Sequence, residues 1–339
     1  MEKIEMIHGS GGQATSELIS EVFAKEFWNG YLAQMNDSAV VAGGAELALT
    51  TDSFVVKPLF FRGGDIGRLA VAGTVNDLLM QGAVPEYMTV GFILEEGLPV
   101  SDLKQIVHSM AKTAEEAGIL IVAGDTKVVD GNGGLYINTT GVGFVPAGME
   151  ISPAQIEKGD AVLVSGNLGD HHAAILSSRM SIENEIASDC APLNDIVRSL
   201  INEGVPVHAM RDITRGGIAT VCKEMAVQSG KTMLLSEELL PVNPQVKDFC
   251  ALTGLDPLFM GNEGKMICIL PEESAEKALS IMKASHYGEN ACRIGKVLRF
   301  EEEGEMQIAP DSGELFLKTA IGGLRKLSVL QGEGLPRIC

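Results

Sequence analysis

The stretch Ile119-Leu120-Ile121-Val122-Ala123-Gly124-Asp125-Thr126-Lys127 is an apolar run that ends in a carboxylate, a hydroxyl and a lysine. A short apolar run bounded by glycine and polar residues is typical of a strand buried inside an α/β sheet. We therefore predict a strand over residues 119–124 that ends at Asp125. The sequence Asp125-Thr126-Lys127 is not a P-loop, so nucleotide binding cannot rest on that motif.

The same pattern of an apolar run beside a carboxylate recurs along the chain. The other positions are Asp37 before the apolar residues 39–41, Asp52 after a strand predicted at 47–51, Asn76 and Asp77 after a strand predicted at 69–75, and Asp212 in the segment 211–217, which opens a helix predicted at 218–229. One such residue is an ordinary turn or helix cap. Several converging carboxylates repel one another unless a cation separates them, and oxygen ligands suit Mg²⁺, which normally brings substrate phosphates. The pattern favours a magnesium–nucleotide site over a set of caps.

Composition limits the class of partner. The chain has 339 residues, of which 45% are hydrophobic and 21% charged, which indicates a globular protein of about two domains. The net charge of −19 argues against a nucleic acid or an anionic membrane surface as partner, because both require a basic patch. An anionic substrate would need a cation to screen it.

The first residues of the chain and the spacing of its cysteines indicate the cellular compartment. Residues 1–13 have no apolar core, so we expect no signal peptide, and the apolar run 69–84 is too interrupted to span a membrane. None of the six cysteines forms a C-x-x-C pair, which argues against a zinc knuckle or a disulfide framework. Cys268 lies in the apolar run 266–270 and is predicted to be core. A reducing cytoplasm fits best.

A domain boundary is predicted near residues 145–159, where prolines and glycines cluster between strands predicted at 136–140 and 141–145 and a strand predicted at 161–164. We predict domains at 1–147 and 148–322 and a tail at 323–339. The tail ends in Cys339, and its glycines and Pro336 disfavour regular structure. It is either a mobile arm that carries a nucleophile or an ordinary disordered terminus.

Other segments remain open to two interpretations. The segment His8-Gly9-Ser10-Gly11-Gly12 either folds over phosphates or is a loose leader before a helix predicted at 13–27. Glu263, before the strand predicted at 266–270, is either a turn carboxylate or a catalytic one. His171 and His172 are adjacent and cannot chelate one ion well from a helix, so we assign them to the first turn before a helix predicted at 173–178. A late strand is predicted at 293–297.

Six motifs together resemble one superfamily over nearly the whole chain. They are Asn36-Asp37-Ser38-Ala39, Thr51-Asp52-Ser53, Val75-Asn76-Asp77-Leu78, Gly124-Asp125-Thr126-Lys127, Arg211-Asp212-Ile213-Thr214-Arg215-Gly216-Gly217 and Gly261-Asn262-Glu263-Gly264. The set resembles the ATP-dependent superfamily that includes aminoimidazole ribonucleotide synthetase and selenophosphate synthetase. Within it, the ending Pro336-Arg337-Ile338-Cys339 is similar to that of the HypE family of hydrogenase maturation proteins.

The resemblance implies a PurM-like fold of two α/β domains with a flexible C-terminal tail, a homodimer, and ATP bound with Mg²⁺. Matching the family's metal positions are Asp37, Asp52, Asp77 and Asp212. Also falling in its nucleotide-binding motifs are Asn76, Asp125, Thr126, Thr214 and Gly216. Lys127 and Glu263 are candidates for proton removal and amide orientation.

The resemblance also implies a reaction and partners. Cys339 would receive a carbamoyl group from the carbamoyltransferase HypF. ATP would then drive dehydration of the thiocarboxamide to a thiocyanate, and the cyano group would pass to a HypC–HypD complex that builds the nickel–iron centre. Two alternatives remain: another synthetase or kinase of the superfamily, or a non-enzymatic assembly protein with a docking tail. A selenophosphate synthetase would carry a reactive cysteine near its N-terminus, whereas the first cysteine here is Cys190.

Overall fold

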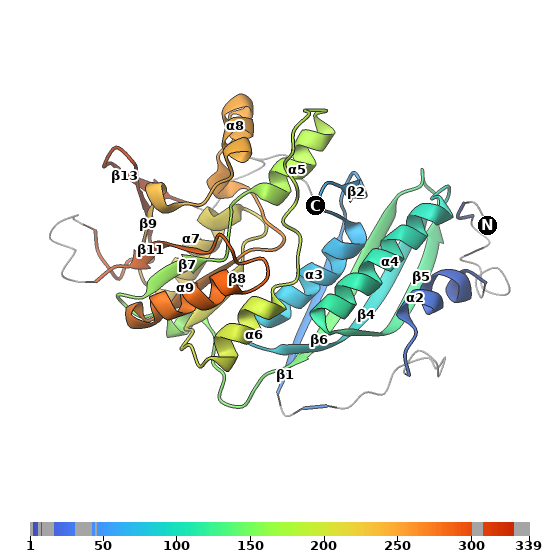
Figure 1. The fold of residues 1–339 in the computed structure, drawn as a ribbon, viewed down its shortest axis with the longest axis horizontal. Coiled ribbons are helices and arrows are strands. Elements are labelled where there is room, and N and C mark those ends of the chain that lie inside the picture. The colour runs from blue at the N-terminus through green and yellow to red at the C-terminus, as the bar shows by residue number, and fades with distance from the viewer. Residues whose placement is uncertain are drawn as a thin grey trace. The chain divides into compact units, whose positions relative to one another are not determined.

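The computed structural model describes residues 3–5, 8, 17–30, 43–44, 46–299 and 308–328. The described residues divide into two compact units. The first contains those up to Leu79 and from Ala83 to Ala147, and the second contains Met80–Gly82 and those from Gly148 onward. Both units mix helices and sheets (Figure 1), so the predicted α/β class is confirmed. No helix in the described ranges is both long and apolar enough to cross a membrane.

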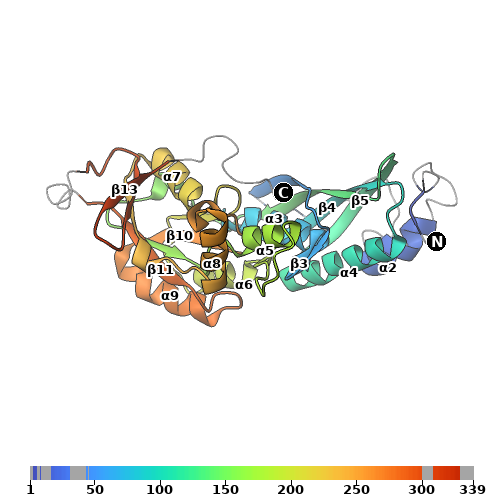
Figure 2. The ribbon, with the colours of Figure 1, turned by 90° about the horizontal axis from the view of Figure 1, so that it is seen from above.

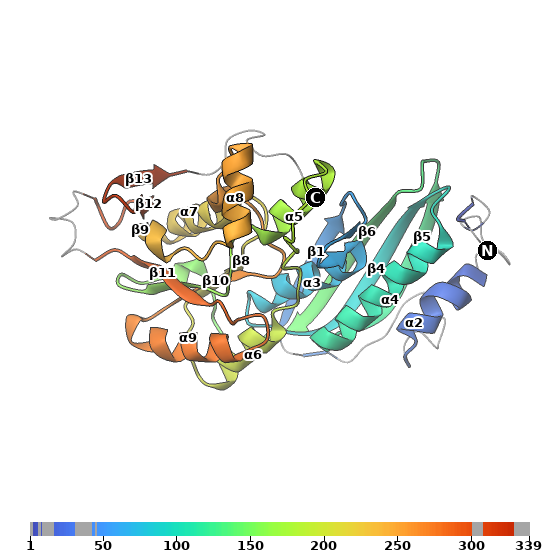
Figure 3. The same ribbon diagram turned by 45° about the horizontal axis from the view of Figure 1, so that its top comes forward.

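The first unit contains a four-stranded sheet in the order β1-β6-β4-β5. Its strands are β1 (Leu47–Phe54), β4 (Val84–Glu95), β5 (Leu120–Val129) and β6 (Leu135–Phe144), and a small hairpin pairs β2 (Phe60–Phe61) with β3 (Gly64–Asp65). Strands β4 and β5 are parallel, and helix α4 (Val100–Ala117) makes the crossover between them. Helices α3 (Ile66–Leu79) and α4 lie along one face of the sheet (Figure 2 and Figure 3).

Two predictions in the first unit are wrong. The predicted strand at 69–75 lies inside helix α3, which is buried on nearly all sides because the sheet and α4 both pack against it. An apolar run of this kind fits a buried strand and a buried helix equally well. The two strands predicted at 136–140 and 141–145 form one strand, β6.

The start of the first unit is a helical segment at the β5 edge. Within the range of the helix predicted at 13–27, the described part contains a π-helix (η2, Ile19–Ala24) followed by α2 (Lys25–Phe27). The ring of Phe23 packs on that of Phe92 in β4, with 4.8 Å between centroids. This contact holds the segment against the sheet.

The second unit is built on a seven-stranded sheet in the order β13-β12-β9-β11-β7-β10-β8. The strands are β7 (Ala161–Val164), β8 (Ala209–Asp212), β9 (Met233–Ser236), β10 (Met266–Leu270), β11 (Cys292–Val297), β12 (Leu315–Lys318) and β13 (Leu324–Leu327). The helices are α5 (Asp170–Arg179), α6 (Asn194–Asn202), α7 (Gly217–Ser229), α8 (Pro244–Thr253) and α9 (Ala275–Ala284), with short 3₁₀ turns η4 (Pro153–Gln155), η5 (Glu237–Leu239), η6 (Pro257–Phe259) and η7 (Glu272–Ser274).

The core of the second unit lies on both faces of this sheet. Helix α7 packs on one face, and α6 and α9 lie over the other (Figure 1). Strands β7 and β10 are buried along their whole length, as continuous apolar runs in a central position should be. The strands predicted at 161–164, 266–270 and 293–297 and the helix predicted at 218–229 are therefore confirmed, and Cys268 is core.

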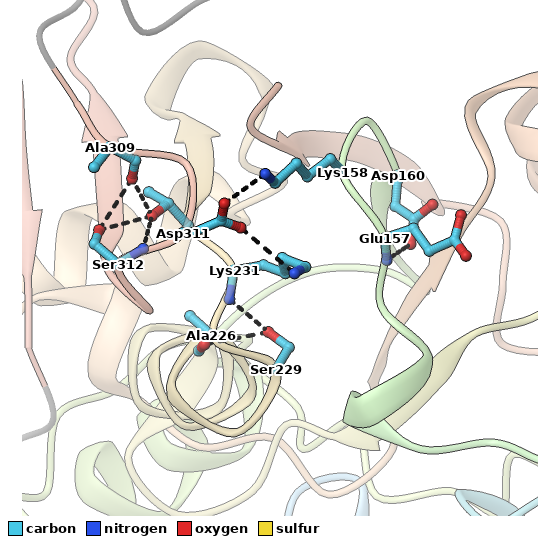
Figure 4. A network of polar contacts seen from close by, with 10 residues as sticks. Glu157, Lys158, Asp160, Ala226, Ser229, Lys231, Ala309, Asp311 and Ser312 are labelled. Atoms are coloured by element: carbon cyan, nitrogen blue, oxygen red, sulfur yellow. Dashed lines mark hydrogen bonds and ion pairs between the residues drawn. The ribbon is translucent and has the colours of Figure 1, made fainter. Parts of the chain in front are cut away.

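A polar brace ties the segment before β12 to the rest of the second unit. The carboxylate of Asp311 accepts from Lys158 Nζ at 2.5 Å and from Lys231 Nζ at 3.4 Å (Figure 4). The hydrogen bond from Lys158 is the main reason that the pKa of Asp311 is lowered. The brace joins the turn before β7, the residues after α7 and the segment 308–312.

Candidate functional site

Two carboxylates of the predicted site lie on the helix-covered face of the first sheet. Asp77, in the last turn of α3, accepts a hydrogen bond from Thr50 Oγ1 at 2.7 Å. Asp52 is two residues beyond Thr50 in β1, so its side chain leaves the strand on the same face. Asn76, beside Asp77, is buried. The structure thus gathers Asp52, Asn76 and Asp77 at the β1 end of the sheet.

Close packing fixes the position of Asp77. The hydroxyls of Thr74 and Thr139 lie 2.5 Å apart and connect α3 to β6. At Gly141 in β6, an added Cβ would come within 2.7 Å of Thr74 Cγ2 and 3.0 Å of Leu78 Cδ1. The helix can therefore approach the sheet only because residue 141 lacks a side chain, and this approach brings Asp77 within reach of Thr50.

The second group of predicted residues lies at the opposite edge of this sheet. Lys127 Nζ donates to both oxygens of Asp125, at 2.9 and 2.8 Å, and this bond lowers the pKa of Asp125. Both residues lie inside β5 rather than at its end, which corrects the prediction. The same holds for Asp52, which lies inside β1.

The register places these two groups on different faces. Asp52 pairs with Thr139, whose buried side chain points to α3, whereas Asp125 pairs with Gly91, which pairs with Asn138 on the other face. Strands β6 and β4 separate β1 from β5, a distance of about 14 Å at the usual strand spacing. One copy of the described chain does not bring Asp125 and Lys127 together with Asp52 and Asp77.

A cavity of about 190 Å³ lies next to Asp125 and Thr126. Its walls are mostly apolar and aromatic, from the segment 19–28 and from strands β4 and β5. Among the aromatic residues that line it are Phe23, Trp28 and Phe92. The cavity can accept a flat apolar group beside two hydrogen-bonding side chains.

In the second unit, the segments that contain Asp212 and Glu263 lie side by side. Asp212 is the last residue of β8 and pairs with Met266 in β10. The next residue, Ile213, donates its N–H to Lys265 O at 2.9 Å and accepts from Asn262 N at 2.8 Å. Two motifs that are far apart in sequence are thereby joined by backbone hydrogen bonds.

The turn into α7 depends on two glycines. Gly216 and Gly217 have φ of +81° and +63°, values that a side chain disfavours. An added Cβ at Gly217 would lie 2.5 Å from Leu258 O. Gly217 N–H donates to Thr214 O at 3.1 Å, so Thr214 lies directly before the helix. The predicted residues Thr214 and Gly216 thus form the turn that links β8 to α7.

A buried amide holds the turn that contains Glu263. Asn262 is fully buried, and its Nδ2 donates to Asn167 O at 3.0 Å and to Asp189 Oδ2 at 2.8 Å. Its Oδ1 accepts from Gly169 N at 3.0 Å. Sequence reasoning missed Asp189, because the segment that contains it has no periodic pattern and no motif.

The two histidines are structural, and they lie within α5, which begins at Asp170 instead of residue 173. His171 is fully buried, and burial lowers its pKa to about 3, with a smaller contribution from the charge of His172. Its Nδ1 lies 2.8 Å from Ser188 Oγ. His171 is therefore neutral at ordinary pH, and it anchors the segment that precedes Asp189.

Asp170 itself has an unusual environment, which makes a stability prediction possible. Burial, and then the charge of Asp189, raise its pKa from 3.8 to about 7. A carboxyl with a raised pKa keeps its proton in the folded state while the unfolded chain has lost it. The resulting loss of stability is absent below pH 3.8, grows as pH rises, and is complete above pH 7.

Asp170→Asn should therefore raise the free energy of unfolding at pH 8 by on the order of 2 kcal/mol or more, and by much less at pH 5. The amide avoids the penalty because it does not ionise. Urea unfolding at pH 5, 6.5 and 8 measures the effect, with the exposed Asp195→Asn as control. A difference between Asp170→Asn and wild type that is the same at all three pH values would contradict the assignment.

The described residues supply only some of the ligands that a Mg²⁺ ion in the predicted nucleotide site would need. Asp52 and Asp77 are oxygen donors on one face, which fits the ligand chemistry of Mg²⁺. The described ranges contain no group of three acidic, histidine or cysteine side chains close enough to hold one ion. Asp37 and Cys339 lie outside the described residues.

Family models match both halves of the chain. One described as AIR synthase related protein, N-terminal domain, matches residues 35–145, and one described as AIR synthase related protein, C-terminal domain, matches residues 157–305. A carbamoyl dehydratase HypE from Cupriavidus necator is 48% identical over 343 residues, which cover 99% of this chain and 95% of that protein. The carbamoyl dehydratase HypE of Escherichia coli strain K12 is 44% identical over the full length of both.

Solved structures agree. A structure of the hydrogenase maturation protein HypE in complex with ATP has a TM-score of 0.93 and 46% identity, over 98% of this chain and 99% of that one. A structure of a HypE–HypF complex has a TM-score of 0.78 and 45% identity, over 92% and 99%. A thiamine monophosphate kinase from Aquifex aeolicus, 22% identical with a TM-score of 0.58 over 75% and 86%, shares the fold. The predicted PurM-like fold is confirmed, and the chain belongs to the HypE family of hydrogenase maturation proteins.

Proposed function

We propose that this chain is an ATP-dependent carbamoyl dehydratase that acts on its own Cys339. HypF transfers a carbamoyl group to the thiol, and this chain converts the thiocarboxamide to a thiocyanate. The cyano group then passes to a HypC–HypD complex as a ligand for iron. Full-length similarity to proteins named carbamoyl dehydratase HypE supports the reaction, and the solved complex of one relative with HypF supports that partner.

The observation that carries this proposal is the state of the other cysteines. The five in the described ranges are Cys190, Cys222, Cys250, Cys268 and Cys292, and all but Cys292 are buried. Burial raises the pKa of the thiol of Cys250 to about 11 and that of Cys268 to about 12, and it also raises the pKa of Cys222 and Cys292. A thiol acts as a nucleophile only as thiolate, so these cysteines are poor acceptors and Cys339 is the candidate that remains.

The chemistry needs activation of a poor leaving group. The amide oxygen of the thiocarboxamide attacks the γ-phosphorus of ATP, which releases ADP and forms an iminophosphate. The C–O bond then breaks, inorganic phosphate leaves, and the N–H proton is removed as the nitrile forms. The sum is one thiocarboxamide and one ATP giving one thiocyanate, ADP, phosphate and a proton. Catalysis of such phosphoryl transfer is mainly positioning and charge neutralisation.

The acidic residues would hold the nucleotide through a cation. Asp37, Asp52, Asp77 and Asp212 are the proposed ligands of Mg²⁺, which when bound neutralises the phosphate charge. Asn76, Asp125, Thr126, Thr214 and Gly216 are proposed to contact the nucleotide, with Asp125 and Thr126 contributed by the second copy of a homodimer, because one copy holds Asp125 away from Asp52 and Asp77. The apolar cavity beside Asp125 and Thr126 would accept the base, whose flat faces suit its aromatic walls.

Lys127 and Glu263 are the proposed catalytic side chains. Lys127 donates to Asp125, so in this ion pair it is a cation that can orient the amide or a phosphate. It could accept a proton only as the neutral amine, that is, after leaving the ion pair with Asp125 and losing a proton of its own. Glu263 is a carboxylate that can accept the N–H proton or orient the amide.

We also propose that the chain divides into an ATP-binding domain at 1–147, a second domain at 148–322 and a tail at 323–339.

We further propose that two copies form a homodimer through the sheet of the first unit. The sheet face opposite α3 and α4 exposes apolar side chains. Leu49 is 67% exposed, Leu47 in the same strand is also exposed, and Ile93 in β4 and Val129 in β5 are exposed elsewhere on the sheet. Exposed apolar side chains gathered on one sheet face favour an interface there.

Intact mass spectrometry tests the function directly. Wild-type protein incubated with HypF, carbamoyl phosphate and ATP should gain the mass of one carbamoyl group. It should then lose one water, with one ATP consumed per thiocyanate formed. The loss of water should require ATP bound to this chain, so a non-hydrolysable analogue added after carbamoylation should stop at the carbamoyl adduct. An adduct that loses water without consuming ATP would contradict the proposal.

A further inference from the structure

The segment 188–191 lies against the turn that contains Glu263. Asp189 Oδ1 accepts a hydrogen bond from Glu263 N at 3.2 Å, and Asp189 Oδ2 accepts from Asn262 Nδ2 at 2.8 Å. Ala191 N donates to Glu263 O at 3.4 Å. Both backbone polar groups of Glu263 are therefore bonded to one short segment, whose position sets the position of Glu263.

The two segments are too close for the turn to shift. An added Cβ at Gly264 would lie 2.0 Å from Asp189 O and 2.8 Å from Ala191 N. Both of these neighbours are backbone atoms, which cannot rotate away as a side chain would. Residue 264 must be glycine for Asp189 to reach Glu263, and the contact leaves no room for another arrangement of the turn.

The segment with Asp189 is itself firmly anchored. Ser188 Oγ lies 2.8 Å from His171 Nδ1 and accepts from Cys190 N at 3.1 Å. His171 is fully buried, and burial lowers its pKa to about 3, so the imidazole is neutral near neutral pH and the bond to Ser188 does not depend on a charge there. Because these bonds hold Ser188, the neighbouring Asp189 has little freedom to move. A side chain that orients another residue must itself be held in place in this way.

Asp189 also differs from an ordinary turn cap. A cap satisfies backbone N–H groups near in sequence, whereas Asp189 bonds residues more than seventy positions away. One oxygen fixes the backbone of Glu263 and the other fixes the side chain of Asn262, the fully buried amide that also bonds Gly169 and Asn167. The carboxylate thus locks Glu263 to the base of α5.

We propose that Asp189 is the positioning residue for Glu263: its carboxylate fixes the backbone at 262–263 so that the Glu263 side chain meets the amide of the carbamoylated tail. This inference rests on the proposed function, because it assigns Glu263 a role in dehydration. Asp189 itself touches no substrate. Its effect appears only through Glu263, which separates it from a residue that merely stabilises the fold.

The first test compares two substitutions of Asp189. Asp189→Ala removes both hydrogen bonds, whereas Asp189→Asn keeps an oxygen that can accept from Glu263 N–H. Since misplacing a reacting group by ~1 Å costs on the order of a hundredfold, we expect the single-turnover rate of thiocyanate formation to fall by about that factor in Asp189→Ala and less in Asp189→Asn. The ATP concentration for half-maximal rate and carbamoylation by HypF should not change.

A double-mutant cycle with Glu263→Gln gives the sharper result. If Asp189 acts through Glu263, Asp189→Ala should have no further effect on the rate when Glu263 is already glutamine. The control is Asp195→Ala. Asp195 lies in α6 of the same unit, and its carboxylate also accepts from a backbone N–H that is distant in sequence, that of His286, at 2.7 Å. This substitution should lower stability without changing the rate of the folded protein.

The outcomes are distinguishable. Effects of Asp189→Ala and Glu263→Gln that multiply, or a Glu263→Gln variant as fast as wild type, would overturn this inference while leaving the dehydratase reaction in place. A wild-type protein that forms no thiocyanate would overturn the proposed function, and this inference with it. A rate loss in Asp189→Ala that disappears when only the folded fraction is counted would show a structural role and also overturn the inference.

Discussion

Asp77→Asn should lower the rate of ATP-dependent dehydration by more than about a hundredfold and leave carbamoylation of Cys339 unchanged. Substituting groups that merely support metal ligands commonly costs 10- to 100-fold, so removing a proposed ligand should cost at least as much. Carbamoyl transfer is performed in the active site of HypF and does not use the nucleotide bound here. The two steps therefore separate cleanly in this variant.

The measurement starts from carbamoylated protein and follows thiocyanate formation in a single turnover. Asp102→Asn is the matched control, since it removes an Asp from the first turn of α4 in the same unit, away from Asp77. Thr50→Val removes the hydrogen bond to Asp77 Oδ2 but keeps the carboxylate, and should cost about tenfold. Asp212→Asn should resemble Asp77→Asn. Normal conversion by both aspartate variants would refute the magnesium assignment.

Helix α3 shows where a local apolar pattern is ambiguous. Residues 69–75 are mostly apolar, which suits a buried strand, yet they lie in a helix that the sheet and α4 enclose. The predicted strands at 161–164 and 266–270 are confirmed, because each apolar run has strand length and is bounded by polar residues or proline. Length and boundaries could be read from the sequence, whereas the partner that buries each face could not.

The site shows a second limit. The motifs around Asp52, Asp77, Asp125 and Asp212 were found by residue type and spacing, but the face on which each side chain lies depends on strand register. Bulges in the pairing of β4 with β5 and with β6 change that register, and local sequence does not reveal them. The structure was therefore needed to show that Asp52 and Asp77 lie on one face of the sheet whereas Asp125 and Lys127 lie on the other.

Asp189 shows the third limit. It lies in a segment without helix or strand, and its bonds to residues 262 and 263 connect positions more than seventy residues apart. A contact of that kind arises from tertiary packing, and the signal in a single sequence is one Asp among many. By contrast, Glu263 was a candidate because it lies between glycines, where backbone can approach closely.

Cys339→Ser should abolish formation of the carbamoyl adduct and hence every later step. A serine hydroxyl is a far weaker nucleophile than a thiol near neutral pH, because almost none of it is ionised, and the product would lack the sulfur that carries the cyano group. Intact mass after incubation with HypF, carbamoyl phosphate and ATP should show unmodified protein. The fold and nucleotide binding should be retained, because the substitution changes one atom.

The matched control is Cys292→Ser, because Cys292 is the most exposed of the cysteines in the described ranges. Its Sγ lies 3.5 Å from Leu239 O, and burial raises the pKa of its thiol, so little of it is thiolate at neutral pH. Cys292→Ser should therefore accept the carbamoyl group at the wild-type rate. Peptide mapping that found an adduct on Cys292 in the Cys339→Ser protein would place the nucleophile elsewhere. In that case Cys339 would not be the acceptor that the proposed reaction requires. The other described thiols are more deeply buried than that of Cys292 and are still less able to form the reactive thiolate.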